Sequence, residues 1–167
     1  MNSKILVAYA TKTGSTAEIA CRIADELKEK GHFVDVISVD QVGSIDDYDT
    51  IILGSAARAG SVLPEATFFV THNQKVLENK NFHMFLVCMT LKDDTENNRK
   101  TVSGYLQPIR EIMDPDCEGL FAGAMDYGKL NFFEKMLAKA LKAPEGDFRR
   151  WDLILAWADE VALKIPA

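Results

Sequence analysis

Five short apolar runs, separated by segments of helical periodicity, constrain the fold of this chain more than any other feature. The runs are KILVAYA (4–10), FVDVISV (33–39), TIILGSA (50–56), HMFLVCM (83–89) and GLFAGAM (119–125). Four of them are almost continuously apolar, which is typical of parallel strands buried on both faces. We therefore predict an α/β fold, a doubly wound parallel sheet with helices on both faces.

The segments between these runs predict the helices. Residues 16–30 carry their apolar side chains on one face, as an amphipathic helix does. Pro64 fits the first turn of a second helix, whereas Pro108 should kink or shorten the helix predicted over 95–113. The last helix is predicted over about 148–165, so that strand and helix alternate along the whole chain.

Length and composition fit one soluble domain. The chain has 167 residues, of which 47% are apolar and 26% are charged. No apolar run approaches the roughly 18 residues that a membrane span needs. We expect a single domain over 1–167. The net charge of −6 disfavours nonspecific binding to nucleic acid, so we expect no nucleic-acid partner.

The cysteines and the N-terminus indicate a reducing location. Cys21, Cys88 and Cys117 are widely spaced, without a Cys-x-x-Cys pair or a Cys/His cluster, so we expect neither disulfides nor a metal. The start of the chain is too short and too strand-like for a signal peptide, and the expected location is the cytoplasm. No Ser-His-Asp or paired-carboxylate arrangement follows from the spacing, so no catalytic residue is assigned.

The loop after the first apolar run is rich in hydroxyl groups. It consists of Thr11, Lys12, Thr13, Gly14, Ser15 and Thr16. Ser15-x-x-Glu18 fits a capping box, which places the helix start at about Thr16. The N–H groups of a first helical turn favour an anion such as a phosphate. The loop lacks the lysine of a Walker loop and the glycines of a dinucleotide turn, and the alternative is that the hydroxyls only cap the helix.

The order Thr11-x-Thr13-Gly14-x-Thr16 after a first strand is similar to the phosphate-binding loop of the flavodoxin family. The resemblance covers the length of the chain. It implies FMN as the cofactor, and a flavodoxin-like five-stranded sheet of order 2-1-3-4-5. It also implies that the loops after the third and fourth strands flank the flavin. The FMN contacts expected beyond the first loop are Ser55, Ala56, Ala57, Arg58, Ala59, Gly60, Met89, Thr90, Leu91, Lys92 and Tyr127.

Departures from ordinary electron-carrier flavodoxins resemble the branch that includes menaquinone-dependent protoporphyrinogen oxidase. The flavin loops contain no Phe, Tyr or Trp over 55–62 and 89–98, and a Lys-rich segment follows the fifth strand. The expected function is an FMN-binding redox protein that carries electrons between partners. The alternatives are a quinone-dependent oxidoreductase of that oxidase type, a quinone reductase, or a flavodoxin-fold binding module without flavin.

Two residues of the first flavin loop have specific expected roles. Gly60 is a candidate for a positive φ, and in the family this loop can flip a peptide whose carbonyl then accepts a hydrogen bond from reduced flavin. Arg58 would place a cation beside the flavin and raise its reduction potential, through an interaction of roughly 3 kcal/mol at ~6 Å. The alternatives are that Gly60 is only a loop glycine, and that Arg58 points into solvent or pairs with Asp93 or Asp94.

The segment 129–150 adds an amphipathic helix before the last helix. Asn131-x-x-Glu134 can cap it, and one face then carries Phe133, Met136, Leu137, Ala140 and Leu141. Six basic and three acidic residues give the segment +3, which leaves −9 for the rest because the whole chain carries −6. We expect it to dock a redox protein partner, to contact the inner face of a membrane peripherally, or to cover a quinone or substrate site. The alternative is that its apolar face packs on the domain. The oligomeric state is left open.

Overall fold

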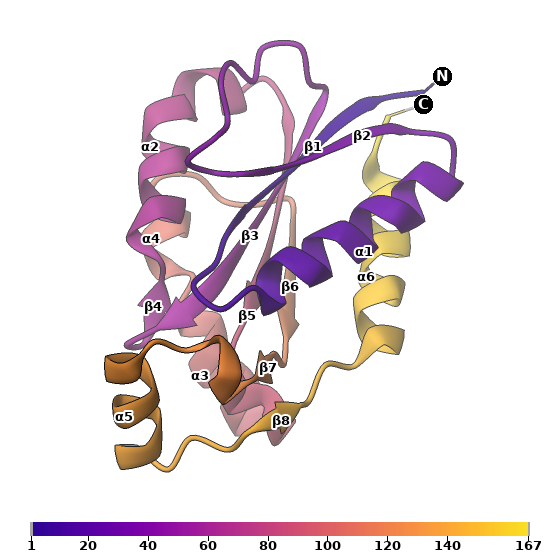
Figure 1. Cartoon of the computed structure of the whole chain (residues 1–167). Coiled ribbons are helices and arrows are strands. Elements are labelled where there is room, and N and C mark those ends of the chain that lie inside the picture. Colours follow the sequence, from indigo (N-terminus) through magenta and orange to yellow (C-terminus); the bar gives the residue numbers. More distant parts are fainter. Residues whose placement is uncertain (1, 167) are drawn as a thin grey trace.

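A parallel sheet lies between two layers of helices in the computed structural model, which describes residues 2–166 (Figure 1). The five principal strands are β1 (Lys4–Ala10), β2 (Phe33–Ser38), β3 (Thr50–Arg58), β5 (Asn81–Val87) and β6 (Cys117–Phe121). They lie in the order β2-β1-β3-β5-β6, and every neighbouring pair is parallel. The strand order and the doubly wound α/β fold expected from the sequence are confirmed.

The strands are apolar on both faces because helices cover both faces. Helices α1 (Ser15–Glu29) and α6 (Trp151–Lys164) pack on one face, and α2 (Pro64–Leu77), α3 (Glu96–Gly104) and α4 (Gln107–Arg110) pack on the other. Along β1, Ile5 and Val7 contribute to the first of these cores, whereas Leu6 and Ala8 contribute to the second. This alternation explains why the apolar runs are continuous.

Pro108 and a short hairpin shape the loops around the sheet. The predicted effect of Pro108 is confirmed, because α3 ends at Gly104 and α4 begins at Gln107 with the proline in its first turn. Strand β3 continues to Arg58 and forms a hairpin with β4 (Ser61–Val62). The two turn residues, Ala59 and Gly60, have φ values of 51° and 74°. The positive φ predicted for Gly60 is confirmed, and that of Ala59 was not predicted.

The chain leaves the sheet after β6 and forms an arm, residues 124–147, before it returns to α6 (Figure 1). In this β7–β8 arm, β7 (Ala124–Met125) pairs antiparallel with β8 (Gly146–Asp147), and α5 (Phe132–Ala140) lies between them in sequence. The strand predicted over 119–125 is therefore wrong beyond Phe121, since its last residues pair within the arm. No helix within residues 2–166 is long and apolar enough to cross a membrane.

Candidate functional site

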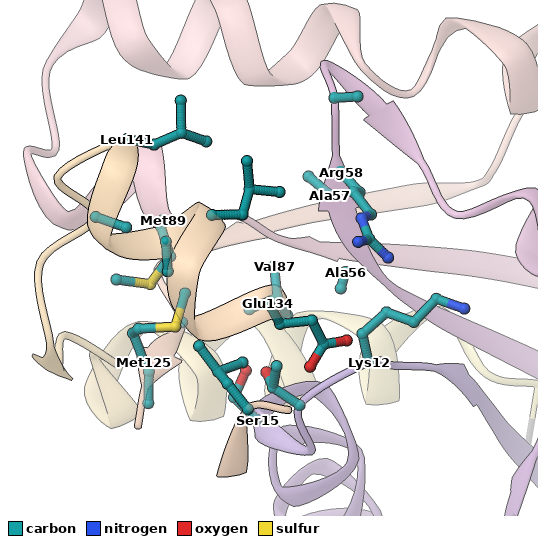
Figure 2. Close-up of a pocket in the computed structure, with 18 of the residues that line it drawn as sticks. Lys12, Ser15, Ala56, Ala57, Arg58, Val87, Met89, Met125, Glu134 and Leu141 are labelled. Atoms are coloured by element: carbon teal, nitrogen blue, oxygen red, sulfur yellow. The ribbon is translucent and has the colours of Figure 1, made fainter. Parts of the chain in front are cut away.

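A cavity of about 330 Å³ opens at the carboxyl edge of the sheet, between the β1–α1 loop, the β3–β4 hairpin and α5 (Figure 2). Its volume is typical of a small-molecule site, for which the range is about 300–1,000 Å³. Converging parallel strands bring these separate loops to one edge. Eight residues expected at the site from the sequence line the cavity: Lys12, Thr13, Ser15, Ala56, Ala57, Arg58, Ala59 and Met89.

The β1–α1 loop leaves the start of α1 without a side-chain cap. Gly14 precedes the helix and has a φ of 93°, a conformation that favours glycine. Its N–H group donates a hydrogen bond to Oγ1 of Thr11 at 3.0 Å, so Thr11 stabilises the turn. No side chain among residues 2–166 accepts a hydrogen bond at this cap. The N–H groups of the first turn, together with the helix dipole, therefore favour an anion.

The capping box predicted for Ser15 and Glu18 is wrong. The helix begins at Ser15, and Gly14 takes the cap position. The carboxylate of Glu18 instead bonds the guanidinium of Arg149, and its Oε1 lies 3.7 Å from Nζ of Lys129. Glu18 therefore joins the base of the β7–β8 arm to α1 rather than capping the helix.

The side-chain hydroxyl of Thr16 indicates whether the residues of this loop fit a bound phosphate. Its side chain is fully buried in the first turn of α1, and Oγ1 has no hydrogen-bond partner within the described part of the chain. An unpartnered buried hydroxyl costs about 1–3 kcal/mol unless another group satisfies it. The unpartnered Oγ1 and the uncapped N–H groups together fit a phosphate oxygen.

Two cations from different elements line the cavity. Nζ of Lys12 lies 2.7 Å from Oε1 of Glu65, in the first turn of α2. This hydrogen bond lowers the pKa of Glu65, and the charge of Arg58 makes a smaller contribution in the same direction. Arg58 is exposed at the end of β3 and forms no ion pair with any of residues 2–166. In the cavity wall, the charge of Lys12 is therefore neutralised by an ion pair, whereas the charge of Arg58 is not.

The acidic loop after β5 does not neutralise Arg58. Asp93 bonds Nζ of Lys92 at 2.6 Å, and Asp94 bonds Nε of Arg99 at 2.5 Å. The alternative in which Arg58 pairs with Asp93 or Asp94 is therefore wrong.

Nine of the expected residues do not line this cavity: Thr11, Gly14, Thr16, Ser55, Gly60, Thr90, Leu91, Lys92 and Tyr127. Ser55 is buried in β3, where its hydroxyl accepts a hydrogen bond from the N–H group of Leu63 at 3.1 Å. Leu91 belongs to the hydrophobic core, and the hydroxyl of Tyr127 donates to the carbonyl of Ala143 within the arm. These three side chains hold the loops that form the site.

The β7–β8 arm supplies wall residues that were not named from the sequence, although covering a quinone or substrate site was one of the alternatives for 129–150. The lining residues from this part of the chain are Gly123, directly before the arm, and Ala124, Met125, Leu130, Glu134, Leu137, Ala138, Leu141 and Ala143 within it. A Cβ on Gly123 would lie 2.9 Å from Cγ1 of Val87 and 3.4 Å from Oγ of Ser15, so glycine permits the close approach of this segment. The only signal in the sequence was the amphipathic pattern of 129–150, which left the position of the helix open.

Helix α5 covers the cavity and also presents apolar side chains to solvent. Its predicted cap is confirmed, because Asn131 and Glu134 form a capping box. Ala138 is the only buried residue of this helix, whereas Phe132 and Phe133 are 72% and 81% exposed. The alternative in which the apolar face packs on the domain is therefore wrong.

Comparisons with known proteins agree with this architecture. The Flavodoxin domain family matches residues 6–151. The protoporphyrinogen IX dehydrogenase [quinone] of Escherichia coli (strain K12) is 25% identical over 172 residues, which cover 95% of this chain and 94% of that protein.

Two solved flavodoxins share the fold. A short-chain flavodoxin associated with a non-canonical PDU bacterial microcompartment has a TM-score of 0.62 at 14% identity, over 98% of this chain and 99% of that one. A Fusobacterium nucleatum flavodoxin bound to flavin mononucleotide has a TM-score of 0.53 at 15% identity, over 98% and 99% of the two chains. The family match spans most of the sequence and both layers of helices. This chain belongs to the flavodoxin domain family.

Proposed function

We propose that this chain is a single-domain, FMN-binding redox protein that carries electrons between partners. The observation that carries the proposal is the cavity, in which the uncapped start of α1 lies beside apolar walls from the β3–β4 hairpin and the arm. We expect the FMN phosphate at loop 11–16 and the flavin ring against Ala56, Ala57 and Met89. Bound FMN supplies one- and two-electron transfer, and the chain binds it, orients it and excludes water.

The residues of the site divide these tasks. The hydroxyls of Thr13 and Ser15, which line the cavity, and the unpartnered hydroxyl of Thr16 would bind the phosphate together with the first N–H groups of α1. Arg58, as a cation without an ion-pair partner in residues 2–166, would stabilise negative charge on the reduced cofactor and raise its potential. The left-handed turn at Gly60 would let the hairpin adjust to the flavin.

A specific observation favours an enzyme as the second candidate function. Helix α5 covers the cavity, which gives an organic substrate an apolar space beside the flavin. The relative named protoporphyrinogen IX dehydrogenase [quinone] is matched over 94% of its length. The second candidate is therefore quinone-dependent oxidation of protoporphyrinogen. A quinone reductase would use the same space, and a redox protein is the alternative partner to a quinone.

We also propose that segment 129–150 contacts a membrane peripherally, at its cytoplasmic face. Lys135, Lys139 and Lys142 form no ion pair within residues 2–166, and they lie on or directly after α5. The same helix exposes Phe132 and Phe133. Exposed aromatic side chains flanked by lysines suit the headgroup region of an anionic bilayer.

An anaerobic reductive titration, followed by absorbance, tests the redox proposal. The purified protein should hold one FMN per chain, lose its yellow colour on reduction and regain it with a soluble menaquinone analogue. Adding protoporphyrinogen and quinone then separates the candidates. Formation of fluorescent porphyrin supports the oxidase, whereas electron transfer to a redox protein without porphyrin formation supports the carrier. A colourless protein that does not take up FMN contradicts both.

Vesicle sedimentation tests the membrane contact. Wild-type protein should bind anionic vesicles more than neutral ones, and binding should fall with salt because exposed charges are screened. Lys135→Gln, Lys139→Gln and Lys142→Gln together should lose this binding and keep FMN affinity. Lys139 and Lys142 are exposed and Lys135 is half-buried, and surface substitutions away from specific contacts typically change stability within ~0.5 kcal/mol. The matched control removes the same charge elsewhere, at the exposed Lys28, Lys75 and Lys100. Equal vesicle binding by the two triple variants contradicts the contact.

A further inference from the structure

We propose that Glu134 is the proton-exchanging residue of the cavity, and that it moves one proton to or from an organic substrate for each pair of electrons. The inference rests on the proposed FMN redox function. It assigns to the β7–β8 arm a role in the chemistry, in addition to covering the site.

Glu134 stands out by its surroundings. It is half-buried in the first turn of α5 and is the only acidic residue among the described residues that line the cavity. Figure 2 shows its carboxylate turned into the cavity, on the side of Lys12 and Ser15. The other α5 residues of the lining are apolar, which makes a carboxylate in this wall an exception.

Only one of the two carboxylate oxygens is occupied. Oε2 of Glu134 accepts the N–H group of Asn131 at 3.1 Å, which completes the capping box. Within residues 2–166, Oε1 accepts no hydrogen bond and the carboxylate forms no ion pair. Oε1 is therefore available to a proton on a molecule in the cavity.

Glu134 shares the cavity with two basic side chains. Lys12 and Arg58 line the same cavity from the β1–α1 loop and from β3, and Glu65 neutralises only Lys12. No second acid in the described lining competes for the proton. Other charged groups of the arm and its base lie outside the lining: Asp126, Lys129, Lys135, Lys139, Lys142, Glu145, Asp147 and Arg149.

Two-electron exchange with an organic substrate also moves a proton, and Glu134 is the acidic residue in the described lining that can accept it. A donor that carries a C–H bond and an N–H bond on one conjugated unit would lose the C–H hydrogen as a hydride, with both electrons, for which bound FMN would be the acceptor. Its N–H bond then releases a proton, which forms an O–H bond on Oε1 of Glu134. In the second half-reaction, a quinone gains the two electrons and the hydrogen as a hydride equivalent, and Glu134 returns its proton to a quinone oxygen. The donor is oxidised, the quinone becomes a quinol, and Glu134 is again a carboxylate.

Glu134→Gln separates proton exchange from helix capping. Glutamine at this position also completes a capping box, so α5 should keep its N-terminus while the proton acceptor is lost. The matched control is Glu145→Gln, in the same arm, because Glu145 is exposed and does not line this cavity. Both variants are tested as FMN-loaded full-length protein, after FMN affinity has been measured.

The first measurement compares two electron acceptors in anaerobic single turnover. With a soluble quinone, which needs protons, Glu134→Gln should react at least 100-fold more slowly than wild type. With ferricyanide, which accepts electrons without protons, the rates should be equal. Glu145→Gln should match wild type with both. An unchanged quinone rate, or an equal loss with both acceptors, overturns the proposal.

The second measurement does not depend on turnover. Reduced-minus-oxidised infrared spectra should show a protonated-carboxyl band in wild type and in Glu145→Gln, and no such band in Glu134→Gln. A wild-type spectrum without the band overturns the role of Glu134, even when FMN binds and is reduced. Failure of the wild-type chain to bind FMN overturns the proposed function itself, so the two failures are distinguishable.

Discussion

At the scale of single residues, the β3–β4 turn shows how backbone geometry selects side chains. A two-residue type I′ turn needs a positive φ at both positions, which Gly60 adopts without strain. Ala59 adopts a φ of 51° with a Cβ, at a cost of order 1 kcal/mol. The sequence indicated Gly60 because glycine signals this geometry, and it did not indicate Ala59 because alanine carries no such signal.

Ala59→Asn should stabilise the protein. Asparagine tolerates the left-handed region better than alanine and leads the type I′ turn in many hairpins, so the free energy of unfolding should rise by up to about 1 kcal/mol. Urea denaturation measures the change. Ala59→Val, which is β-branched, should lower stability in the same assay. A less stable Asn variant would show that this turn does not strain Ala59.

His83 should make the fold sensitive to acid. It is fully buried in β5, and neither ring nitrogen has a hydrogen-bond partner within residues 2–166. Burial lowers the pKa of His83, while the neighbouring Asp116 and Glu160 oppose this shift and Lys164 adds to it. The unfolded chain therefore binds more protons below about pH 6.5, and stability should fall as the pH falls through that value.

The comparison of wild type with His83→Leu tests whether His83 makes stability fall as the pH falls. Between pH 7.5 and pH 5, urea denaturation should show a larger loss of stability for wild type than for the leucine variant, which has no imidazole to protonate. Parallel stability profiles for the two proteins would exclude His83 as the source of acid sensitivity.

At the scale of elements, the same four-residue capping pattern predicted two helix caps. One of the two predictions is confirmed and the other is wrong. Asn131-x-x-Glu134 caps α5 as predicted, whereas Ser15-x-x-Glu18 does not cap α1. The preceding Gly14 takes the cap position, and the carboxylate of Glu18 bonds Arg149, which lies 131 residues away in sequence. A local pattern cannot show a competing partner of this kind.

Arg149 should hold the β7–β8 arm against α1. Its guanidinium bonds Glu18, bonds Asp147 at 2.7 Å and lies 4.8 Å from the ring of Trp151, and its side chain is only 11% exposed. Arg149→Met should leave global stability nearly unchanged but speed hydrogen exchange in residues 124–147 by about tenfold, equivalent to about 1.4 kcal/mol.

The control for this prediction is Arg150→Met. Arg150 is 60% exposed and pairs with Asp152 within α6 and its cap, so it makes no link between the arm and α1. Exchange in the arm should stay at the wild-type rate in this variant. Equal exchange rates in both variants would mean that Arg149 does not hold the arm.

At the scale of the whole molecule, the sheet was predictable and the site was predictable only in part. Continuous apolar runs require helices on both faces, and parallel strands direct their following loops to one edge. Those two rules correctly predict that loop 11–16, the β3–β4 hairpin and Met89 lie around one site. The position of α5 could not be predicted, because it depends on β7–β8 pairing and on the Glu18–Arg149 contact, both distant in sequence.

The relative affinity for FMN and riboflavin tests most directly the central claim that a phosphate binds at loop 11–16. Wild-type apoprotein should prefer FMN. Thr13→Val with Thr16→Val should weaken FMN binding at least tenfold, because each lost hydrogen bond to a charged group costs ~1.5–3 kcal/mol. Riboflavin binding, which involves no phosphate, should change little. Equal losses for both ligands, or no preference for FMN in wild type, would contradict the claim.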